Sequence, residues 1–288
     1  MSEQEQAERI PRIGFIGFGE VASVLARALN EKGAEVAAYD LVPGKVTAPF
    51  LPLAELLARC DWILSTVTTQ AARQAAESCA PLLRPGQLYL DLNSTSPEEK
   101  VAIGRVIGRS PAGFAEGVIL GAVGAEGAAV RILTGGPEGR RAAGLLSRLG
   151  LKARFFSERT GQASLFKMLR SVFSKGLEAL LLEMLAAARR AGLEQELWED
   201  VAAFMSGNPF ERVAENWIRT HPGACERRYH ELRQVGQTLR ELGFAPLMAA
   251  AAEAFFDRSR ALALPAAFPE KPASWAAVVE YLAQRLRA

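Results

Sequence analysis

The feature that most constrains the fold is a glycine-rich turn near the N-terminus, with the sequence IGFIGFGEVA over residues 13–22. It joins an apolar run at 13–16, which we predict to be a strand, to an Ala/Leu-rich run at 21–29, which we predict to be a helix. Gly17 allows a tight turn, Gly19 lets the backbone approach a phosphate, and Ala22 is small enough for close helix–strand packing. The G-x-G-x-x-A spacing in this context predicts a dinucleotide-binding βαβ unit.

An acidic residue supports this interpretation. The second predicted strand, 35–39, ends at Asp40, which lies 21 residues after Gly19. An acid at this spacing binds the ribose 2′-hydroxyl and repels a 2′-phosphate, so it favours NAD over NADP. Lys45 lies five residues further on and could instead reach a 2′-phosphate, which leaves NADP as the alternative cofactor. The competing interpretation of the whole segment is a packing turn with a chance surface aspartate.

The residues that we assign to the cofactor site lie at strand ends or at the first turn of the helix, where unpaired N–H groups face a phosphate. They are Gly17, Phe18, Gly19, Glu20, Val21, Asp40, Val67 and Thr68.

Strands alternate with helices over the first 160 residues, and this alternation predicts a parallel sheet. Further strands are predicted at 62–67, 87–92, 113–120, 130–133 and 153–156, and helices at 53–59, at 71–83 and from Pro97. From Gly161 the pattern is almost continuously helical, with breaks at 207–209, 221–223, 243–246 and 265–272. We therefore predict the α/β class: a Rossmann-type doubly wound parallel sheet in residues 1–160, followed by an all-α substrate and dimerisation domain in residues 161–288. The length of 288 residues agrees with two domains.

Composition excludes several classes of partner. The chain has 34 Lys and Arg against 32 Asp and Glu, a net charge of +2, so it lacks the electrostatic footprint of a nucleic-acid-binding or membrane-surface protein. Its most apolar stretch, 177–188, is interrupted by two glutamates and is too short to cross a bilayer. Three widely spaced cysteines and a polar N-terminus without signal-peptide features predict a cytoplasmic protein with reduced thiols. With two histidines and no CxxC pair, we predict no metal site.

A polar segment, DLNSTSP at 91–97, follows a predicted strand at its carboxyl end. Ligands of open α/β sheets bind at this edge, so Asn93, Ser94 and Thr95 are predicted to bind substrate through hydrogen bonds. The alternative is a helix cap, because Ser96 and Pro97 already read as an N-cap and a first helical residue.

A second polar feature lies on the helix predicted at 163–191. At 100° per residue, a single stripe contains Lys167, Arg170, Ser171, Ser174 and Glu178. The same helix is apolar on most sides at 180–185, which is typical of a central helix. The stripe is therefore predicted to face a cleft, and the alternative is a solvated polar face.

The order of these motifs resembles the β-hydroxyacid dehydrogenase superfamily, which includes 6-phosphogluconate and 3-hydroxyisobutyrate dehydrogenases. The resemblance runs from Ile13 to about Glu183: the glycine-rich turn, D-x-N-S-T-S-P, a glycine-rich segment at 117–136, and G-x5-K at the start of the long helix. The C-terminal region is less similar, which indicates a less characterised, phosphogluconate-dehydrogenase-like branch. The resemblance implies an NAD(P)-dependent oxidoreductase that transfers a hydride between the nicotinamide and a hydroxy acid or related secondary alcohol.

The resemblance also implies roles for individual residues. Lys167 occupies the place of the catalytic lysine, a general base on the substrate hydroxyl and an acid in the reverse direction, with a pKa lowered by burial or by Arg170. Ser171 stands where the family usually has a catalytic Asn, and Arg170 stands where 6-phosphogluconate enzymes have His and is assigned to the substrate. Gly121 and Ala122 match two glycines of the family's substrate-binding Ser-Gly-Gly.

One position departs from that Ser-Gly-Gly pattern. Leu120 stands in the place of the serine, which favours a bulkier or less polar substrate.

Two alternatives to a hydroxy acid dehydrogenase stay open. An imine reductase shares the architecture, although such enzymes usually replace the lysine by another proton donor. A nucleotide-binding protein without turnover is the second alternative, and the changes at Leu120 and Ser171 give it some support. A homodimer is predicted in each case, because the long apolar helix offers more hydrophobic surface than one small domain covers.

Overall fold

The structure, a computed structural model, describes residues 10–286 and divides into two compact units, with the division between Val172 and Phe173. The division falls inside helix α8 (Gln162–Ala191), whose first residues belong to the first unit. The domain boundary that the sequence predicts at residue 160 lies just before this helix. The first unit contains the cofactor motif and the candidate catalytic lysine.

A seven-stranded sheet forms the centre of the first unit, in the order β2-β1-β3-β4-β5-β6-β7. Its strands are β1 (Ile13–Ile16), β2 (Val36–Tyr39), β3 (Trp62–Ser65), β4 (Leu88–Asp91), β5 (Gly113–Leu120), β6 (Arg131–Gly135) and β7 (Lys152–Ser157). The first five are parallel, and β7 is parallel to β6. The predicted α/β class with a largely parallel sheet is therefore confirmed.

One strand pair departs from the prediction, because β6 runs antiparallel to β5. Only residues 121–130 connect the two strands, and they contain no more than the short helix α6 (Val123–Glu126) and a 3-10 turn (Gly127–Ala129). A parallel neighbour needs a crossover of about a dozen residues or more. The connection is too short for this, so the chain turns back on itself.

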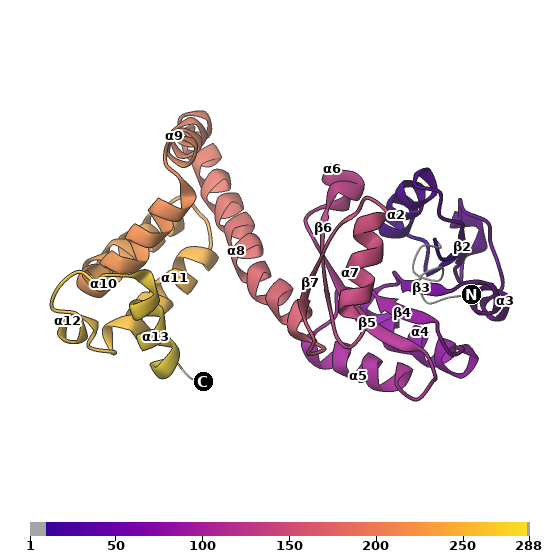
Figure 1. Ribbon diagram of the computed structural model, residues 1–288. Coiled ribbons are helices and arrows are strands. Elements are labelled where there is room, and N and C mark those ends of the chain that lie inside the picture. Colours follow the sequence, from indigo (N-terminus) through magenta and orange to yellow (C-terminus); the bar gives the residue numbers. More distant parts are fainter. Residues whose placement is uncertain (1–9, 287–288) are drawn as a thin grey trace. The chain divides into compact units, whose positions relative to one another are not determined.

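Helices cover both faces of the sheet (Figure 1). On one face, α2 (Glu20–Glu31) and α7 (Gly139–Arg148) bury Leu25, Leu29 and Leu145 against the strands. On the other face, α3 (Leu53–Arg59), α4 (Ala72–Cys79) and α5 (Pro97–Ile107) bury residues such as Leu56 and Ile103. Short 3-10 turns lie at Pro43–Lys45, Thr69–Ala71 and Ala80–Leu82. The strands are thus covered on both sides, as expected for a parallel sheet.

The start of α5 follows the predicted cap. The Ser96 hydroxyl accepts a hydrogen bond from the Glu99 N–H at 3.2 Å, and Pro97 occupies the first helical position. This cap ends the DLNSTSP segment and fixes the direction in which the chain leaves β4.

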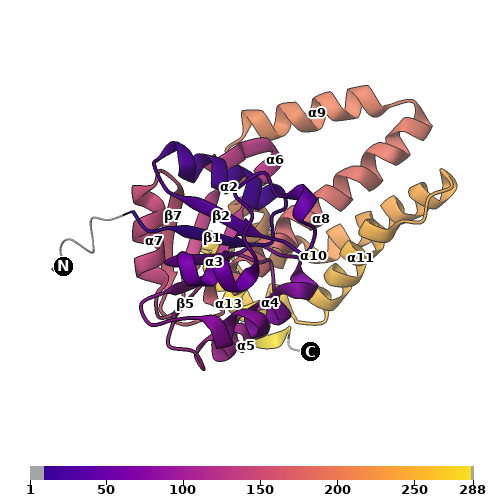
Figure 2. The same cartoon turned by 90° about the vertical axis from the view of Figure 1, so that its right-hand side faces the viewer.

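The second unit is entirely helical, as predicted. It contains the rest of α8 together with α9 (Glu194–Gly207), α10 (Phe210–Glu241), α11 (Leu247–Arg260), α12 (Leu264–Ala267) and α13 (Trp275–Arg285). The chain reverses direction between α8 and α9 (Figure 2). The Glu183 carboxylate of α8 accepts hydrogen bonds from the Met248 and Ala249 N–H groups at 2.9 and 3.0 Å, and so caps the start of α11.

The predicted helix break at 221–223 is wrong. Helix α10 continues through Pro222, whose nitrogen has no hydrogen to donate, so one helical hydrogen bond is lost. In the turn before the proline, the Trp217 carbonyl accepts hydrogen bonds from the Thr220 hydroxyl and the Arg228 guanidinium, both at 3.3 Å. Packing of α10 along α11 and α13 outweighs the local break signal.

None of the helices within residues 10–286 combines the length and the apolar character that crossing a membrane requires.

Candidate active site

The glycine-rich turn between β1 and α2 depends on Gly17. Its φ is +82°, and a Cβ there would lie 2.7 Å from Val67 Cγ1 and 2.9 Å from the Thr66 carbonyl oxygen. Only glycine adopts this conformation at this proximity without strain. Gly19 is different, because a Cβ on this N-cap residue of α2 would have no atom within 4 Å. The turn therefore leaves open space in front of the N-terminus of α2, where a phosphate binds most favourably.

Asp40 lies at the end of β2, next to this turn, as its spacing from Gly19 predicts. One carboxylate oxygen accepts a hydrogen bond from the Phe18 N–H at 2.7 Å, and the other accepts from the Val42 N–H at 2.8 Å. The aspartate thus braces the turn in the protein itself. Each oxygen keeps a further lone pair with which it can accept a ribose hydroxyl.

A cavity of about 470 Å³ opens at the carboxyl ends of the parallel strands. This is the edge at which open α/β sheets bind their ligands. The cavity brings together residues from separate parts of the chain that were predicted to bind the cofactor, to bind substrate or to catalyse the reaction. Of these, the lining contains Glu20, Val21, Val67, Thr68, Asn93, Ser94, Gly121 and Lys167.

Lys167 lies in the first turns of α8 and reaches into this cavity. Its ammonium donates a hydrogen bond to the Ser94 hydroxyl, with 2.6 Å between Nζ and Oγ. Burial lowers the pKa of Lys167 to about 8, and the nearby positive charge of Lys100 acts in the same direction. The second cause is therefore Lys100, and not Arg170 as the sequence offered. A lysine in this state supplies a neutral amine near physiological pH.

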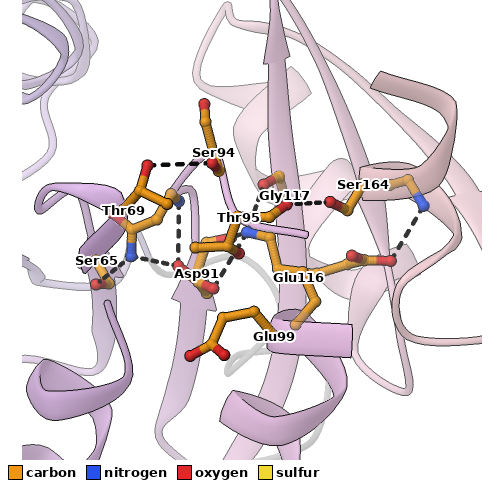
Figure 3. Close-up of polar contacts among 12 residues, drawn as sticks. Ser65, Thr69, Asp91, Ser94, Thr95, Glu99, Glu116, Gly117 and Ser164 are labelled. Carbon is orange, nitrogen blue, oxygen red and sulfur yellow. Dashed lines mark hydrogen bonds and ion pairs between the residues drawn. The ribbon is translucent and has the colours of Figure 1, made fainter. Parts of the chain in front are cut away.

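Hydrogen bonds to residues of β3, β4 and α8 hold the polar segment after β4 in place (Figure 3). The Asn93 amide donates to the Ser65 hydroxyl at 2.9 Å and also to the Asp91 carboxylate. The Thr95 carbonyl accepts a hydrogen bond from the Ser164 hydroxyl of α8. Asn93 and Thr95 are buried, whereas Ser94 is exposed toward Lys167. Asn93 and Thr95 thus hold the segment in place, and Ser94 presents its hydroxyl to the cavity.

Several other predicted site residues do not line this cavity. Arg170 is exposed on α8, and the Ser171 hydroxyl donates back to the Lys167 carbonyl at 2.9 Å. The Ala122 N–H donates to the Glu126 carboxylate at 3.3 Å. Leu120 is buried with Leu133 and Ala163 at the start of α8, so its side chain does not shape the cavity.

Two buried charged residues near the cavity were not predicted from the sequence, and Lys100 is the first. Its Nζ lies 3.1 Å from the Asp91 carboxylate, 2.8 Å from the Asp91 carbonyl oxygen and 3.2 Å from the Gly117 carbonyl oxygen. A signal was present in the sequence, because Lys100, Ile103 and Ile107 share one face of α5 at i, i+3 and i+7. A lysine on the apolar face of an amphipathic helix indicates a buried partner.

Glu116 of β5 is the second. One of its oxygens accepts hydrogen bonds from the Gly161 and Ala163 N–H groups at 2.8 and 3.2 Å, at the start of α8. Burial raises the pKa of this carboxyl, and the backbone hydrogen bonds and Lys100 oppose that rise. Its sequence signal is an acid within a strand that is otherwise apolar. Glu116 thereby fixes the end of the helix that carries the catalytic candidate.

Residues 10–286 contain no group of three or more His, Cys, Asp or Glu side chains arranged to hold a metal ion.

Comparison with known proteins identifies the family. A family model described as the NAD binding domain of 6-phosphogluconate dehydrogenase matches residues 12–151, and a domain of unknown function (DUF1932) matches residues 188–259. A solved structure of a conserved protein of unknown function, described as similar to 3-hydroxyacid dehydrogenases, is 32% identical, with a TM-score of 0.57. The alignment covers 91% of this chain and all of that chain. This chain belongs to the β-hydroxyacid dehydrogenase superfamily.

Two further proteins are similar to this chain. The 2-(hydroxymethyl)glutarate dehydrogenase of Eubacterium barkeri is 23% identical over 222 residues, which is 72% of this chain and 73% of that enzyme. An imine reductase from Pseudomonas sp. is 15% identical with a TM-score of 0.77, over 95% of this chain and all of that chain. At this identity the second likeness concerns the fold alone. The family resemblance inferred from the motifs is confirmed.

The first unit of this β-hydroxyacid dehydrogenase superfamily member is an NAD-binding domain. Its residues fit a dinucleotide, because Gly19 leaves open space at the N-terminus of α2 and both Glu20 and Val21 line the cavity beside it. Val67 and Thr68, which follow the end of β3, line the same cavity. The protein is therefore an oxidoreductase with a nicotinamide-cofactor fold.

Proposed function

We propose that this protein is an NAD-dependent dehydrogenase that acts on the hydroxyl group of a hydroxy acid or related secondary alcohol, with Lys167 as the general acid and base. The observation that carries the proposal is the Lys167 ammonium in the cofactor-side cavity, 2.6 Å from the Ser94 hydroxyl and with its pKa lowered to about 8. The name of the E. barkeri relative, a hydroxy acid dehydrogenase, supports this substrate class.

In the direction of oxidation, neutral Lys167 accepts the proton of the substrate hydroxyl. The bound nicotinamide supplies the hydride acceptor, or the hydride donor in the reverse direction. In reduction, protonated Lys167 returns the proton to the carbonyl oxygen. Ser94 accepts a hydrogen bond from Lys167 and so orients its nitrogen. Gly17, Phe18, Gly19, Glu20 and Val21 would hold the pyrophosphate.

NAD rather than NADP is proposed as the preferred cofactor. Asp40 lies beside the Phe18 N–H, and its negative charge disfavours a 2′-phosphate at the end of β2. Lys45 lies in the following 3-10 turn (Pro43–Lys45), so NADP remains the alternative. Thermal stabilisation by each cofactor, at the same concentration, separates the two.

The roles of Arg170, Ser171, Gly121 and Ala122 stay predictions. Gly121 lines the cavity, whereas Arg170, Ser171 and Ala122 do not. Alanine substitution of Arg170 followed by the measurement of KM and kcat tests whether it binds substrate.

The deciding experiment screens wild type against a panel of hydroxy acids with NAD and NADP, and follows the formation of the reduced cofactor. Lys167→Ala should abolish turnover and leave cofactor binding intact. The control Lys152→Met alters an exposed lysine of β7 and should change neither turnover nor cofactor binding. Turnover by Lys167→Ala at the wild-type rate contradicts the assignment.

The same panel, extended to cyclic imines with reduced cofactor, tests the two alternatives. Reduction of imines without oxidation of any hydroxy acid identifies an imine reductase, whose fold this chain shares. Cofactor binding without turnover of either class identifies a nucleotide-binding protein.

A homodimer is also proposed. Large apolar side chains are exposed along α8, α9 and α10, among them Leu182 (66% exposed), Trp198 (50%) and Trp217 (50%). Exposed apolar side chains of this size and number favour a protein–protein contact. Light scattering during gel filtration measures the mass directly, and a monomer at micromolar concentration contradicts the proposal. The cytoplasmic location inferred from the cysteines stays a prediction that cell fractionation tests.

A further inference from the structure

Lys100 is one of three fully buried charged side chains near the cavity, together with Asp91 and Glu116. It has no exposed surface, and each of its three ammonium hydrogens has an acceptor: the Asp91 carbonyl, the Asp91 carboxylate and the Gly117 carbonyl. Two of these acceptors belong to the last residue of β4, and the third belongs to β5. One ammonium therefore joins the carboxyl end of β4 to the neighbouring strand.

The segment that follows β4 depends on this junction. The Asp91 carboxylate, which Lys100 holds by one oxygen, accepts through its other oxygen from the Asn93 N–H at 3.1 Å and from the Asn93 amide. Asn93 in turn precedes Ser94, whose hydroxyl is the partner of Lys167. A continuous chain of hydrogen bonds thus runs from Lys100 through Asp91 to Asn93. Asn93 is the neighbour of Ser94, which accepts the hydrogen bond from Lys167.

A buried ion pair rarely gives more stability than apolar residues of the same volume, since both charges lose their hydration. Met at this position, paired with an uncharged side chain at position 91, would fill the space on α5 beside Ile103 and Ile107 without that cost. What lysine adds is a set of three directed hydrogen bonds, which fix the position of the strand ends.

We propose that Lys100 is a positioning residue: its buried ammonium fastens the end of β4 to β5 and thereby places Ser94 against Lys167. The charged groups that face it are Asp91 of β4 and Glu116 of β5, both of which favour its charged form, although burial lowers its pKa. Lys167 of α8 is the other cation nearby, and the Lys100 charge disfavours protonation of Lys167. Lys100 therefore acts on Lys167 through both position and charge.

The test compares wild type, Lys100→Met and the control Lys152→Met, an exposed lysine of the same unit. Limited acetylation at a series of pH values, with mass spectrometry of each lysine, gives the titration midpoint of Lys167 without any substrate. Hydrogen exchange of the amides at 92–95 reports how firmly the segment is held.

In Lys100→Met the midpoint of Lys167 should move upward from about 8, by less than the full interval to 10.5, because the burial of Lys167 itself remains. Exchange at 92–95 should become faster, and Lys152→Met should match wild type in both readouts. A folded Lys100→Met with the wild-type midpoint and wild-type exchange overturns the proposal.

Removing Lys100 leaves the Asp91 carboxylate buried without its cation, and the variant can fail to fold. The double variant Lys100→Met/Asp91→Asn removes both charges and is measured in the same way. Wild type supplies an independent check, because Lys100 should be acetylated at least ~100-fold more slowly than exposed Lys152 if it opens only on unfolding. Equal rates overturn the proposal whatever the variants do.

The consequence for turnover rests on the proposed function of Lys167. If the active wild type oxidises hydroxy acids, Lys100→Met should shift its pH–rate profile upward together with the Lys167 midpoint. If wild type turns over nothing, the proposed function fails, whereas acetylation and exchange still decide the role of Lys100.

Discussion

Lys167 should make the rate of hydroxy acid oxidation rise steeply with pH. Oxidation needs the neutral amine, and the pKa of Lys167 is lowered from 10.5 to about 8. At pH 7 the neutral fraction is then about 9%, against ~0.03% for an ordinary lysine, a gain of roughly 300-fold. The logarithm of kcat/KM for oxidation should therefore increase with a slope near one below about pH 8 and level off above it. Reduction should show the opposite dependence, with loss of activity above the same pH.

Lys167→Arg sharpens this test, because a guanidinium keeps the positive charge and cannot deprotonate in this range. Oxidation by this variant should fall by about 100- to 10,000-fold, the usual contribution of general acid–base catalysis, and lose its pH dependence below pH 9. Cofactor binding, measured by thermal stabilisation, should persist. A wild-type profile that is flat between pH 6 and 9, or a Lys167→Arg variant of wild-type activity, refutes the reasoning.

Three further predictions concern the cofactor turn and the start of α8. Asp40→Asn keeps an acceptor for the Phe18 N–H but removes the charge, so the ratio of NADP to NAD affinity should rise by about tenfold, ~1.4 kcal/mol; an unchanged ratio in binding titrations contradicts it. Gly17→Ala should cost about 1–3 kcal/mol of unfolding free energy because of its φ of +82° and the close Thr66 carbonyl, whereas Gly19→Ala should leave the melting temperature unchanged and weaken only cofactor binding. Burial raises the pKa of Glu116 above 4.5, so the folded state holds that proton more tightly than the unfolded chain does. The contribution of Glu116 to stability is therefore present below pH 4.5 and is lost as the pH rises through its pKa in the folded state. In urea titrations, the free energy of unfolding of Glu116→Gln should therefore increase relative to that of wild type as the pH rises from 4.5. If the two proteins show the same dependence of this free energy on pH, the raised pKa of Glu116 is contradicted.

The sequence predicted the elements whose signals are local. The turn at Gly17 needs a residue that tolerates positive φ and tight contact, and the spacing of the motif alone indicates this requirement. The cap at Ser96 and Pro97 is likewise a local arrangement. The antiparallel return of β6 and the continuity of α10 through Pro222 were missed, because chain packing and connection length decided them.

The candidate site shows the same division. Lys167, Ser94 and Asp40 were found because each occupies a fixed place in a motif. Lys100 and Glu116 were missed because the local sequence shows only that each lies among apolar residues, and not which groups pair with its charge. Their partners lie on other strands or at the start of α8.

The sequence by itself thus determined the family, the α/β class, the cofactor turn and the lysine of the candidate active site, since motif spacing and periodicity are properties of a continuous stretch of chain. Only the tertiary structure decided which hydroxyl meets Lys167, which charge lowers its pKa and which carboxylate caps α8. The physical reason is that burial and electrostatic coupling depend on distances between groups far apart in the chain. Folding sets those distances when it pairs β4 with β5 and buries Lys100 against Asp91 and Gly117.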